Sequence, residues 1–559
     1  MGIADHFWQD RLTNHANRPI NFMHTSIESL EARIAPASVF TYTDIDGDKV
    51  KVTSSKGTLT AANFTLSDGD SGNLLTLTLT NAQFAGGDIT FSVVKKAGGD
   101  GRADVGTLDT RGIDLNVVTI KGDVSRILGG DANTQSPAYA TLKELSMGEK
   151  DLASGASNIV GRIGELLVKR NIRGTQIFVH GNDLQNPDPA AKIDLLKVGG
   201  SLIGEGGATS GNIQAEGGFG DIVIGRNLIG GDGDFSGRIE ADTGIGTLRV
   251  GGSIVGGAGE FSGSISGDVG LGSAKIGRDI AAGTGKGSGA IRIDASIGDV
   301  RVGRDVIGGP SSESGLIWAK DGNLGAVVIG RNVIGGDAVG TASVAKTGGI
   351  IANDTIESVR INGSLIAGSD QSTGTLFSSG VVLAGKHLGP LFVGKNIVGN
   401  QTNRVVVSAV DAEFIPPGGS DLAIDQITVG GRVTLANILA GFDLNGGADN
   451  ADASIGPVKV GGSWSSSNLV AGAIDAGTPG YGVGDTLQPV SNGMLIARIA
   501  GITIGGKVLG SETGTYGFVS QQIDSLKIAG KRIALTDGPS NDGSKPIPGA
   551  TNIFVEEVS

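Results

Sequence analysis

The chain has 559 residues, a formal net charge of −13 and no cysteine, and 98 of its residues are glycine. The lack of cysteine excludes disulfides and thiolate metal sites. The acidic balance disfavours a general nucleic-acid binder, which needs a basic footprint. The glycines follow no strict three-residue period, which excludes collagen. No apolar run reaches the roughly 18 residues that a transmembrane helix requires.

The N-terminal segment precedes any repeat. Residues 1–25 contain no apolar core of about 7–15 residues, so they are not an ordinary secretory signal, and we expect a disordered leader. Residues 26–37 predict one short helix, because Ile27, Leu30 and Ile34 share a helical face.

The next segment, residues 38–112, alternates apolar and polar residues and predicts an antiparallel β unit that caps the first coil of the repeat region. Within it, "DIDGD" places Asp44, Asp46 and Asp48 at alternate positions. One interpretation is a β-hairpin with an Asp-Gly turn. The other is an acidic loop that binds Ca²⁺ weakly. The hairpin is favoured because the twelfth-position glutamate and the following helix of an EF-hand are missing; no other cofactor is indicated.

A thirteen-residue phrase, such as "IGDVRVGRDVIGG" from Ile297, recurs fifteen times within residues 113–535. Four successive steps between residues 193 and 297 are 26 residues long, and a period in the twenties is typical of a solenoid. Apolar–polar alternation inside each phrase indicates strands. The first apolar residues of the copies are Leu115, Leu142, Ile163, Ile193, Phe219, Ile245, Leu271, Ile297, Leu324, Ile356, Leu388, Ile424, Ile455, Ile499 and Ile523.

These patterns predict an all-β fold: one long parallel β-helix of about 15 coils, with the small N-terminal β cap and a C-terminal cap over residues 536–559. A second phrase, "SGRIEA" at 236, also recurs every 26 residues and predicts a further strand, with Ile239 inward and Arg238 outward. Short polar residues after the first strand, such as Asn227 and Ser253, are expected to bond to the corner backbone from coil to coil.

The segment "SLEARIAPA" at 29–37, then "FTYTDIDGDKVKVTSSKGTL" at 40–59 and glycine-rich "VGGSLIGG"-like repeats, resembles a class of bacterial β-strand-repeat proteins. The resemblance covers nearly the whole chain. It implies an exported or cell-surface location and a structural or adhesive role, and it supplies no catalytic residue.

Positively charged residues recur at one outward position of the first strand and at the corner that follows it. If coils stack in register, these residues form a cationic stripe that could take an extended polyanion, such as an acidic polysaccharide or a cell-envelope component. The plainer interpretation is a solvated face whose charges block sideways association. The strand positions are Lys197, Val223, Arg249, Lys275, Arg301, Val328 and Arg360; the corner positions are Arg226, Arg278, Arg304, Arg331 and Lys395.

The preferred hypothesis is therefore a non-enzymatic surface or exported solenoid, with lateral or end-to-end self-association as a further way of acting. The alternative is a β-helix polysaccharide lyase or glycoside hydrolase. Such enzymes need convergent acids, or Ca²⁺ with a basic residue, on one face. The excursions near 401–420 and 466–495 are poor in such clusters, and His180 and His387 lie in no recognisable catalytic motif.

Overall fold

The structure, a computed structural model, describes residues 37–69, 71–183, 185–412, 415, 420–477, 480–489 and 495–559. The part from Ala37 onward is one compact unit. The leader, and the expected helix apart from Ala37, lie outside the described residues. Strands make up nearly all of the regular structure in the described part, which otherwise holds only the 3₁₀ turns η1 (Ala61–Asn63) and η2 (Ala82–Phe84).

A six-stranded barrel forms the N-terminal end of this unit. Its strands pair in a closed circuit: β1 (Ser38–Thr43), β2 (Lys49–Ser54), β5 (Ile89–Val94), β7 (Leu115–Gly130), β6 (Val105–Arg111) and β4 (Ser71–Thr78), which returns to β1; β3 (Phe64–Asp68) pairs antiparallel with β4. The expected unit was antiparallel throughout, and this is wrong for four of the six pairings that close the barrel. β5 and β6 both run parallel to β7, because β7 also starts the parallel ladder.

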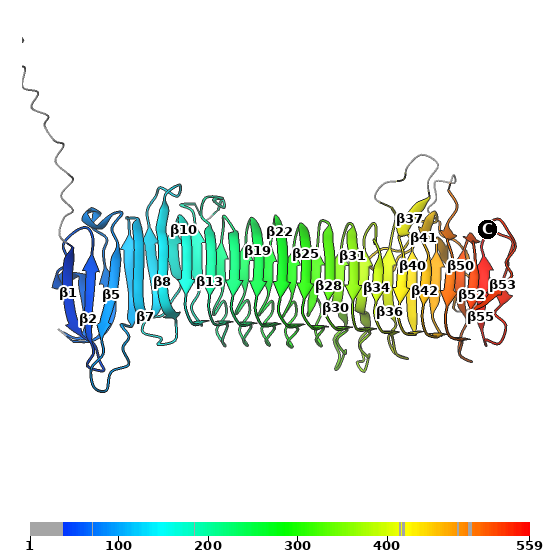
Figure 1. Cartoon of the computed structure of the whole chain (residues 1–559), viewed down its shortest axis with the longest axis horizontal. Helices are drawn as coiled ribbons and strands as arrows, with labels where there is room; N and C mark the ends of the chain where they lie inside the picture. The colour runs from blue at the N-terminus through cyan, green and yellow to red at the C-terminus, as the bar shows by residue number, and fades with distance from the viewer. Residues whose placement is uncertain are drawn as a thin grey trace, which may run out of the picture. The chain divides into compact units, whose positions relative to one another are not determined.

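The ladder beyond the barrel is a β-solenoid, in which the strands of each coil pair in parallel with those of the next (Figure 1). We call the three rows of stacked strands the first, second and third columns. Fifteen described strands form the first column: β7, β8 (Pro137–Met147), β10 (Arg162–Val168), β13 (Ile193–Val198), β16 (Phe219–Ile224), β19 (Gly244–Val250), β22 (Gly270–Ile276), β25 (Ser296–Val302), β28 (Leu324–Ile329), β31 (Ile356–Ile361), β34 (Leu391–Val393), β38 (Ile427–Val429), β42 (Val458–Val460), β48 (Ile502–Ile504) and β52 (Leu526–Ile528).

Two-residue strands form the second column: β11 (Ile172–Arg173), β14 (Leu202–Ile203), β17 (Leu228–Ile229), β20 (Ile254–Val255), β23 (Ile280–Ala281), β26 (Val306–Ile307), β29 (Val333–Ile334), β32 (Leu365–Ile366), β35 (Ile397–Val398), β39 (Val433–Thr434), β43 (Trp464–Ser465) and β49 (Val508–Leu509). The third column contains β9 (Ser157–Val160), β12 (Ile177–His180), β15 (Ile213–Ala215), β18 (Ile239–Ala241), β21 (Ile265–Gly267), β24 (Ile291–Ile293), β27 (Leu316–Ala319), β30 (Val344–Ala352), β33 (Leu376–Ala384), β36 (Val405–Ala409), β40 (Ala436–Ala440), β44 (Asn468–Ala471), β50 (Tyr516–Ser520) and β55 (Ile553–Glu557).

The remaining strands lie beside the columns near the C-terminal end. β53 (Lys531–Ile533) and β54 (Lys545–Pro546) pair antiparallel with β52 and β55, and β45 (Ala473–Ile474) pairs with β46 (Thr486–Leu487). A small parallel set extends the first column: β37 (Asp421–Ile424), β41 (Ala453–Ile455), β47 (Arg498–Ile499) and β51 (Gln522–Ile523).

The fifteen repeat copies predicted this ladder with one misalignment. Leu115 and Ile163 both pair with Tyr139, whereas Leu142 pairs with Val118, so the copy assigned to Leu142 is out of register by three residues. The misalignment arises because Tyr139 fills the inward position that Ile, Leu or Phe occupies elsewhere, and an aromatic residue with a hydroxyl did not match the pattern. Tyr139 is fully buried and its hydroxyl hydrogen bonds with that of Thr110.

The interior is a continuous apolar core to which all three columns contribute. Ile239 and Ile265 of the third column are fully buried, as are Ile254 and Ile280 of the second, which matches the predicted inward facing. Close stacking of coils also explains part of the glycine content. A Cβ on Gly303 would lie 2.2 Å from the carbonyl oxygen of Gly277 in the preceding coil, so no other residue fits there without a backbone shift.

The corner after each first-column strand contains the predicted polar ladder. The side chain of Asn227 accepts a hydrogen bond from the backbone N–H of Ser253, and the Ser253 hydroxyl accepts from the N–H of Asp279. The series continues through Asp305, which accepts from the N–H of Asn332. Each side chain therefore satisfies a backbone donor that the turn leaves unpaired and fixes the register of neighbouring coils.

Candidate functional site

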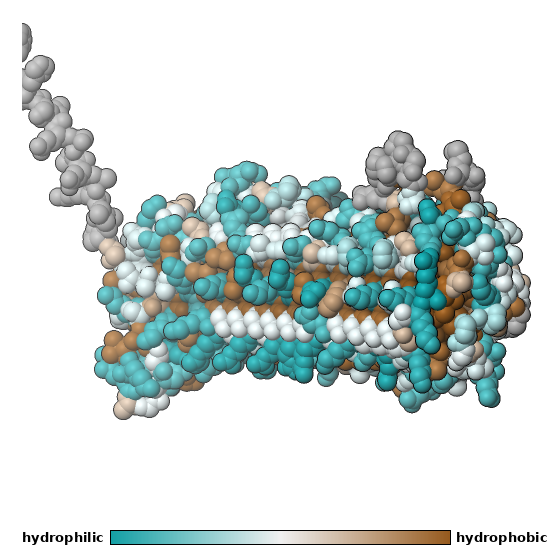
Figure 2. Space-filling model, turned by 45° about the vertical axis from the view of Figure 1, so that its right-hand side comes forward, coloured by the Kyte–Doolittle hydropathy of each residue, from teal (hydrophilic) through white to brown (hydrophobic). Residues whose placement is uncertain are grey.

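The predicted cationic positions of the first column lie on its outer face in unbroken register. The in-register series is Lys197, Val223, Arg249, Lys275, Arg301, Val328 and Arg360, which we call the basic row. All five of its cations are exposed. Adjacent strands are about 4.8 Å apart, so the row places charged groups at nearly regular intervals along the unit. Figure 2 shows a face on which hydrophilic side chains stand along a band of hydrophobic colour.

A second cationic row follows the corner. Backbone hydrogen bonds run from Arg278 to Gly252, from Arg304 to Arg278 and from Arg331 to Arg304, so these positions stack in successive coils. Arg226 precedes them, because Gly252 donates to its carbonyl. Two of these arginines have acidic neighbours: Arg304 lies 3.5 Å from Asp279, and Arg331 lies 3.6 Å from Asp305.

Other cations of the two rows have no carboxylate neighbour. Within the part of the chain that the structure describes, no carboxylate lies within 4.0 Å of Arg226, Arg249, Lys275, Arg278, Arg301 or Arg360. Arg360 instead lies over the ring of Phe392, with 4.1 Å between the guanidinium carbon and the ring centroid. The surface of the basic row is hollowed by about 210 Å³ where Arg249, Lys275 and Arg301 meet Asp299.

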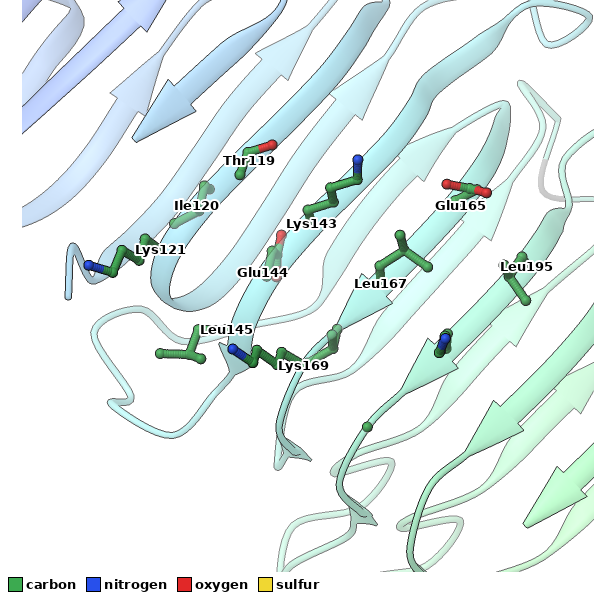
Figure 3. Close-up of a pocket in the computed structure, with 13 residues that line it drawn as sticks. Thr119, Ile120, Lys121, Lys143, Glu144, Leu145, Glu165, Leu167, Lys169 and Leu195 are labelled. Carbon is green, nitrogen blue, oxygen red and sulfur yellow. The ribbon is translucent and has the colours of Figure 1, made fainter. Parts of the chain in front are cut away.

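A larger groove of about 710 Å³ lies on the first column towards the barrel (Figure 3). Lys143, Leu167 and Lys197 are in register across β8, β10 and β13, so the groove continues the basic row towards the N-terminal end. Lys121 and Lys169 add cations to its edge, and Leu145 and Leu195 give it an apolar surface. Lys143 lies outside the predicted stripe because the repeat spacing there is irregular; the alternation of Lys143 with core residues was the pattern in the sequence that indicates its outward position.

The same region of β8 contains a carboxyl group in an apolar place. Glu144 is paired with Ile120 and Val168, which are core residues, and it is 4% exposed. Neither carboxyl oxygen has a hydrogen-bond partner among the described residues. Burial, reinforced by the nearby charge of Asp123, raises the pKa of Glu144 well above its usual value.

The acidic turn of the barrel forms the β-hairpin that the sequence favours. β1 and β2 pair antiparallel, and the N–H of Asp44 donates to the carbonyl of Asp48 across the turn. The carboxylates of Asp44, Asp46 and Asp48 lie within 4.8 Å of one another. Burial and the neighbouring Asp46 raise the pKa of Asp44 to about 7. Asp48 accepts from the N–H groups of Lys96 and Gly101, which gives this carboxylate a structural role; calcium binding stays a prediction.

One outward position differs from expectation. Arg238 precedes β18 and was expected to be solvent-exposed, but its side chain is only 15% exposed. Two phenylalanines from neighbouring coils, Phe235 and Phe261, cover it, with ring centroids 5.2 and 6.0 Å from its guanidinium carbon. The sequence does contain a pattern that indicates these stacked phenylalanines, because "DFSG" at 234 is repeated as "EFSG" at 260, one period later.

The two histidines outside the leader do not form a catalytic constellation with each other. His180 stacks on Phe178 at 4.7 Å between ring centroids. His387 lies 3.3 Å from a carboxylate oxygen of Asp425 and its other ring nitrogen contacts the carbonyl of Leu422.

Comparison of the chain with protein-family models, with curated proteins and with solved structures finds no match in any of the three. None of the helices in the described residues is long and apolar enough to span a membrane.

Proposed function

We propose that this chain is a non-enzymatic, exported or cell-surface β-solenoid that binds an extended acidic polysaccharide along the basic row. The observation that carries the proposal is the in-register stacking of Arg249, Lys275 and Arg301, exposed and without a carboxylate partner in the described residues. Like charges directly opposite one another on a sheet are destabilising. A row that is kept in spite of this cost is well suited to a ligand that neutralises it.

The spacing of the row supports a linear polyanion over a compact one. One coil advances by about 4.8 Å, close to the length of one sugar residue in an extended chain, so successive cations can meet successive uronate groups. The acids beside the row limit the affinity: Asp299 borders the hollow next to Arg301, and Asp221 lies in register with Thr247 on the neighbouring outward position. Binding should therefore be strong only at low ionic strength. The resemblance to bacterial β-strand-repeat proteins supports the exported or cell-surface location.

The test is binding of polygalacturonate at low salt to the parent and to the triple variant Arg249→Ser, Lys275→Ser, Arg301→Ser. We expect the variant to bind at least about tenfold more weakly, and the difference to shrink at high salt. The matched control removes the same charge from exposed lysines of the barrel region, Lys49, Lys51 and Lys95. Equal binding by the parent and the triple variant would show that the basic row does not bind the polysaccharide and serves only to keep this face solvated. Release of unsaturated or reducing sugar would instead favour the enzyme alternative.

A further inference from the structure

A pocket outside the basic row lies on the third column, beside β18, β21 and β24. The corner before these strands holds the same left-handed backbone in successive coils, with φ of 58° at Phe235, 52° at Phe261 and 65° at Gly287. Backbone hydrogen bonds from Phe235 to Glu260 and from Phe261 to Lys286 keep these positions stacked. Glycine adopts this conformation most easily, yet two consecutive coils place a large aromatic residue there.

The two rings form a stacked surface that arginines line. The centroids of Phe235 and Phe261 are 5.8 Å apart with 17° between the ring planes. The guanidinium carbon of Arg292 lies 5.5 Å from the Phe261 centroid, in addition to the Arg238 contacts described above. Gly287 occupies the next corner of the stack, and the Phe261 ring lies against it, because a Cβ on Gly287 would be only 2.3 Å from that ring. The aromatic stack therefore ends at this glycine.

Beside the rings lies a cavity of about 180 Å³ lined by Phe261, Arg238, Arg292, Asp268 and Asp294 among others. Pockets that enclose a whole drug-sized ligand measure about 300–1,000 Å³. This one is smaller, so it suits a single ring of a longer molecule that continues into solvent.

The pocket offers an acceptor that the described residues leave unused. The carboxylate of Asp268 is exposed and accepts no hydrogen bond from them, whereas Asp294 is occupied by Lys320 at 3.3 Å. Arg292 is engaged on its own side of the pocket, where its Nη1 lies 3.3 Å from a carboxylate oxygen of Glu313. A ligand hydroxyl in the pocket can therefore donate to Asp268.

The lining selects the charge of the ligand. Two arginines and two aspartates line the cavity, so their formal charges cancel. A carboxylate-bearing ring would be repelled by the like charge of Asp268, and a cationic ring would be repelled by Arg292 and Arg238. A neutral ring whose substituents both donate and accept hydrogen bonds avoids both conflicts. An aromatic surface beside such groups also needs a ligand with an apolar face.

We propose that this pocket binds one residue of a neutral glycan. The C–H face of the sugar ring lies against Phe261, and a hydroxyl donates to Asp268. The inference does not rest on the proposed function, because it concerns another column of the solenoid and an uncharged ligand.

The test is titration of the full chain with cellohexaose, xylohexaose, mannohexaose and N-acetylchitohexaose by calorimetry, with saturation-transfer NMR to identify the sugar protons in contact. The diagnostic variant is Phe261→Gly, which copies the residue that the next coil carries at the same corner and so spares the fold. We expect at least one of these probes to bind, and to bind at least tenfold more weakly to Phe261→Gly. Phe261→Tyr should retain binding. The variant Arg249→Ser, Lys275→Ser, Arg301→Ser should bind the neutral probe as the parent does.

Four results would overturn the proposal. The first is that none of the four hexasaccharides binds. The second is equal binding by the parent and Phe261→Gly, which would make the stacked rings a purely structural cover for Arg238. The third is that oligogalacturonate binds at Phe261 and the neutral probes do not. The fourth is loss of neutral-probe binding in the basic-row variant alone, which would assign that binding to the first column.

Discussion

Lys275 and Arg301 are directly paired residues of two neighbouring parallel strands, β22 and β25, and both side chains point outward. Arg249 lies opposite Lys275 on its other side. A carboxylate at residue 275 would therefore face two cations.

We expect Lys275→Glu to raise the free energy of unfolding by about 1 kcal/mol at low salt, since two repulsive pairs become attractive. The gain should largely vanish at high salt. Urea unfolding at 10 mM and 500 mM NaCl measures both effects. The same variant should weaken polygalacturonate binding. A variant less stable than the parent at low salt would contradict the claim that the row is electrostatically costly.

The stacking of glycines can be tested with two substitutions of the same kind. Gly303→Ala should lower the free energy of unfolding by about 1–3 kcal/mol, because its Cβ would press on the carbonyl of Gly277. Gly206→Ala meets no atom within 4 Å and should be neutral, or stabilising by up to about 1 kcal/mol through the unfolded state. Thermal unfolding of both variants decides the matter; equal losses would show that coil spacing is not what requires glycine at 303.

The buried Glu144 predicts an unusual pH dependence. Its raised pKa means that the folded state keeps a proton which the unfolded state releases above about pH 4.3. This group therefore reduces stability progressively as the pH rises from that value towards the folded-state pKa. Glu144→Leu should remove the effect, so its advantage over the parent should grow by up to about 1.4 kcal/mol per pH unit. Melting curves from pH 4 to 8 test this, with the part-exposed Glu165→Leu as control. A pH-independent difference would show that Glu144 finds a partner.

The assigned facing of the third column predicts a strong effect at Ile239. Ile239→Asp would bury an unpaired charge among the core residues of three coils, and we expect a loss of several kcal/mol in the free energy of unfolding. Arg249→Asp is the appropriate control, because Arg249 is exposed, whereas Arg238 is covered by two rings. Similar urea midpoints for the two variants would refute the facing.

The amino-acid sequence was sufficient for the features that repeat. The 26-residue steps predicted which residues stack, and Arg249, Lys275 and Arg301 are indeed in register. Alternation within each phrase predicted which side chains face inward. The short polar residue after each first strand predicted the corner ladder. These features depend only on the chain's period and on the two faces of a strand, and both can be read along one dimension.

The tertiary structure alone decided what covers each outward residue. Arg238 and Arg249 both occupy outward positions, yet one is covered by Phe235 and Phe261 while the other is exposed. Likewise Glu144, in a coil of irregular length, lies in a core position that the repeat reserves for Val or Ile. For Arg238 the reason is that the corner's backbone angles direct Phe235 and Phe261 across neighbouring coils, and the period contains no information on that direction. For Glu144, which lies within β8, the irregular spacing of the coil conceals which residues take the core positions.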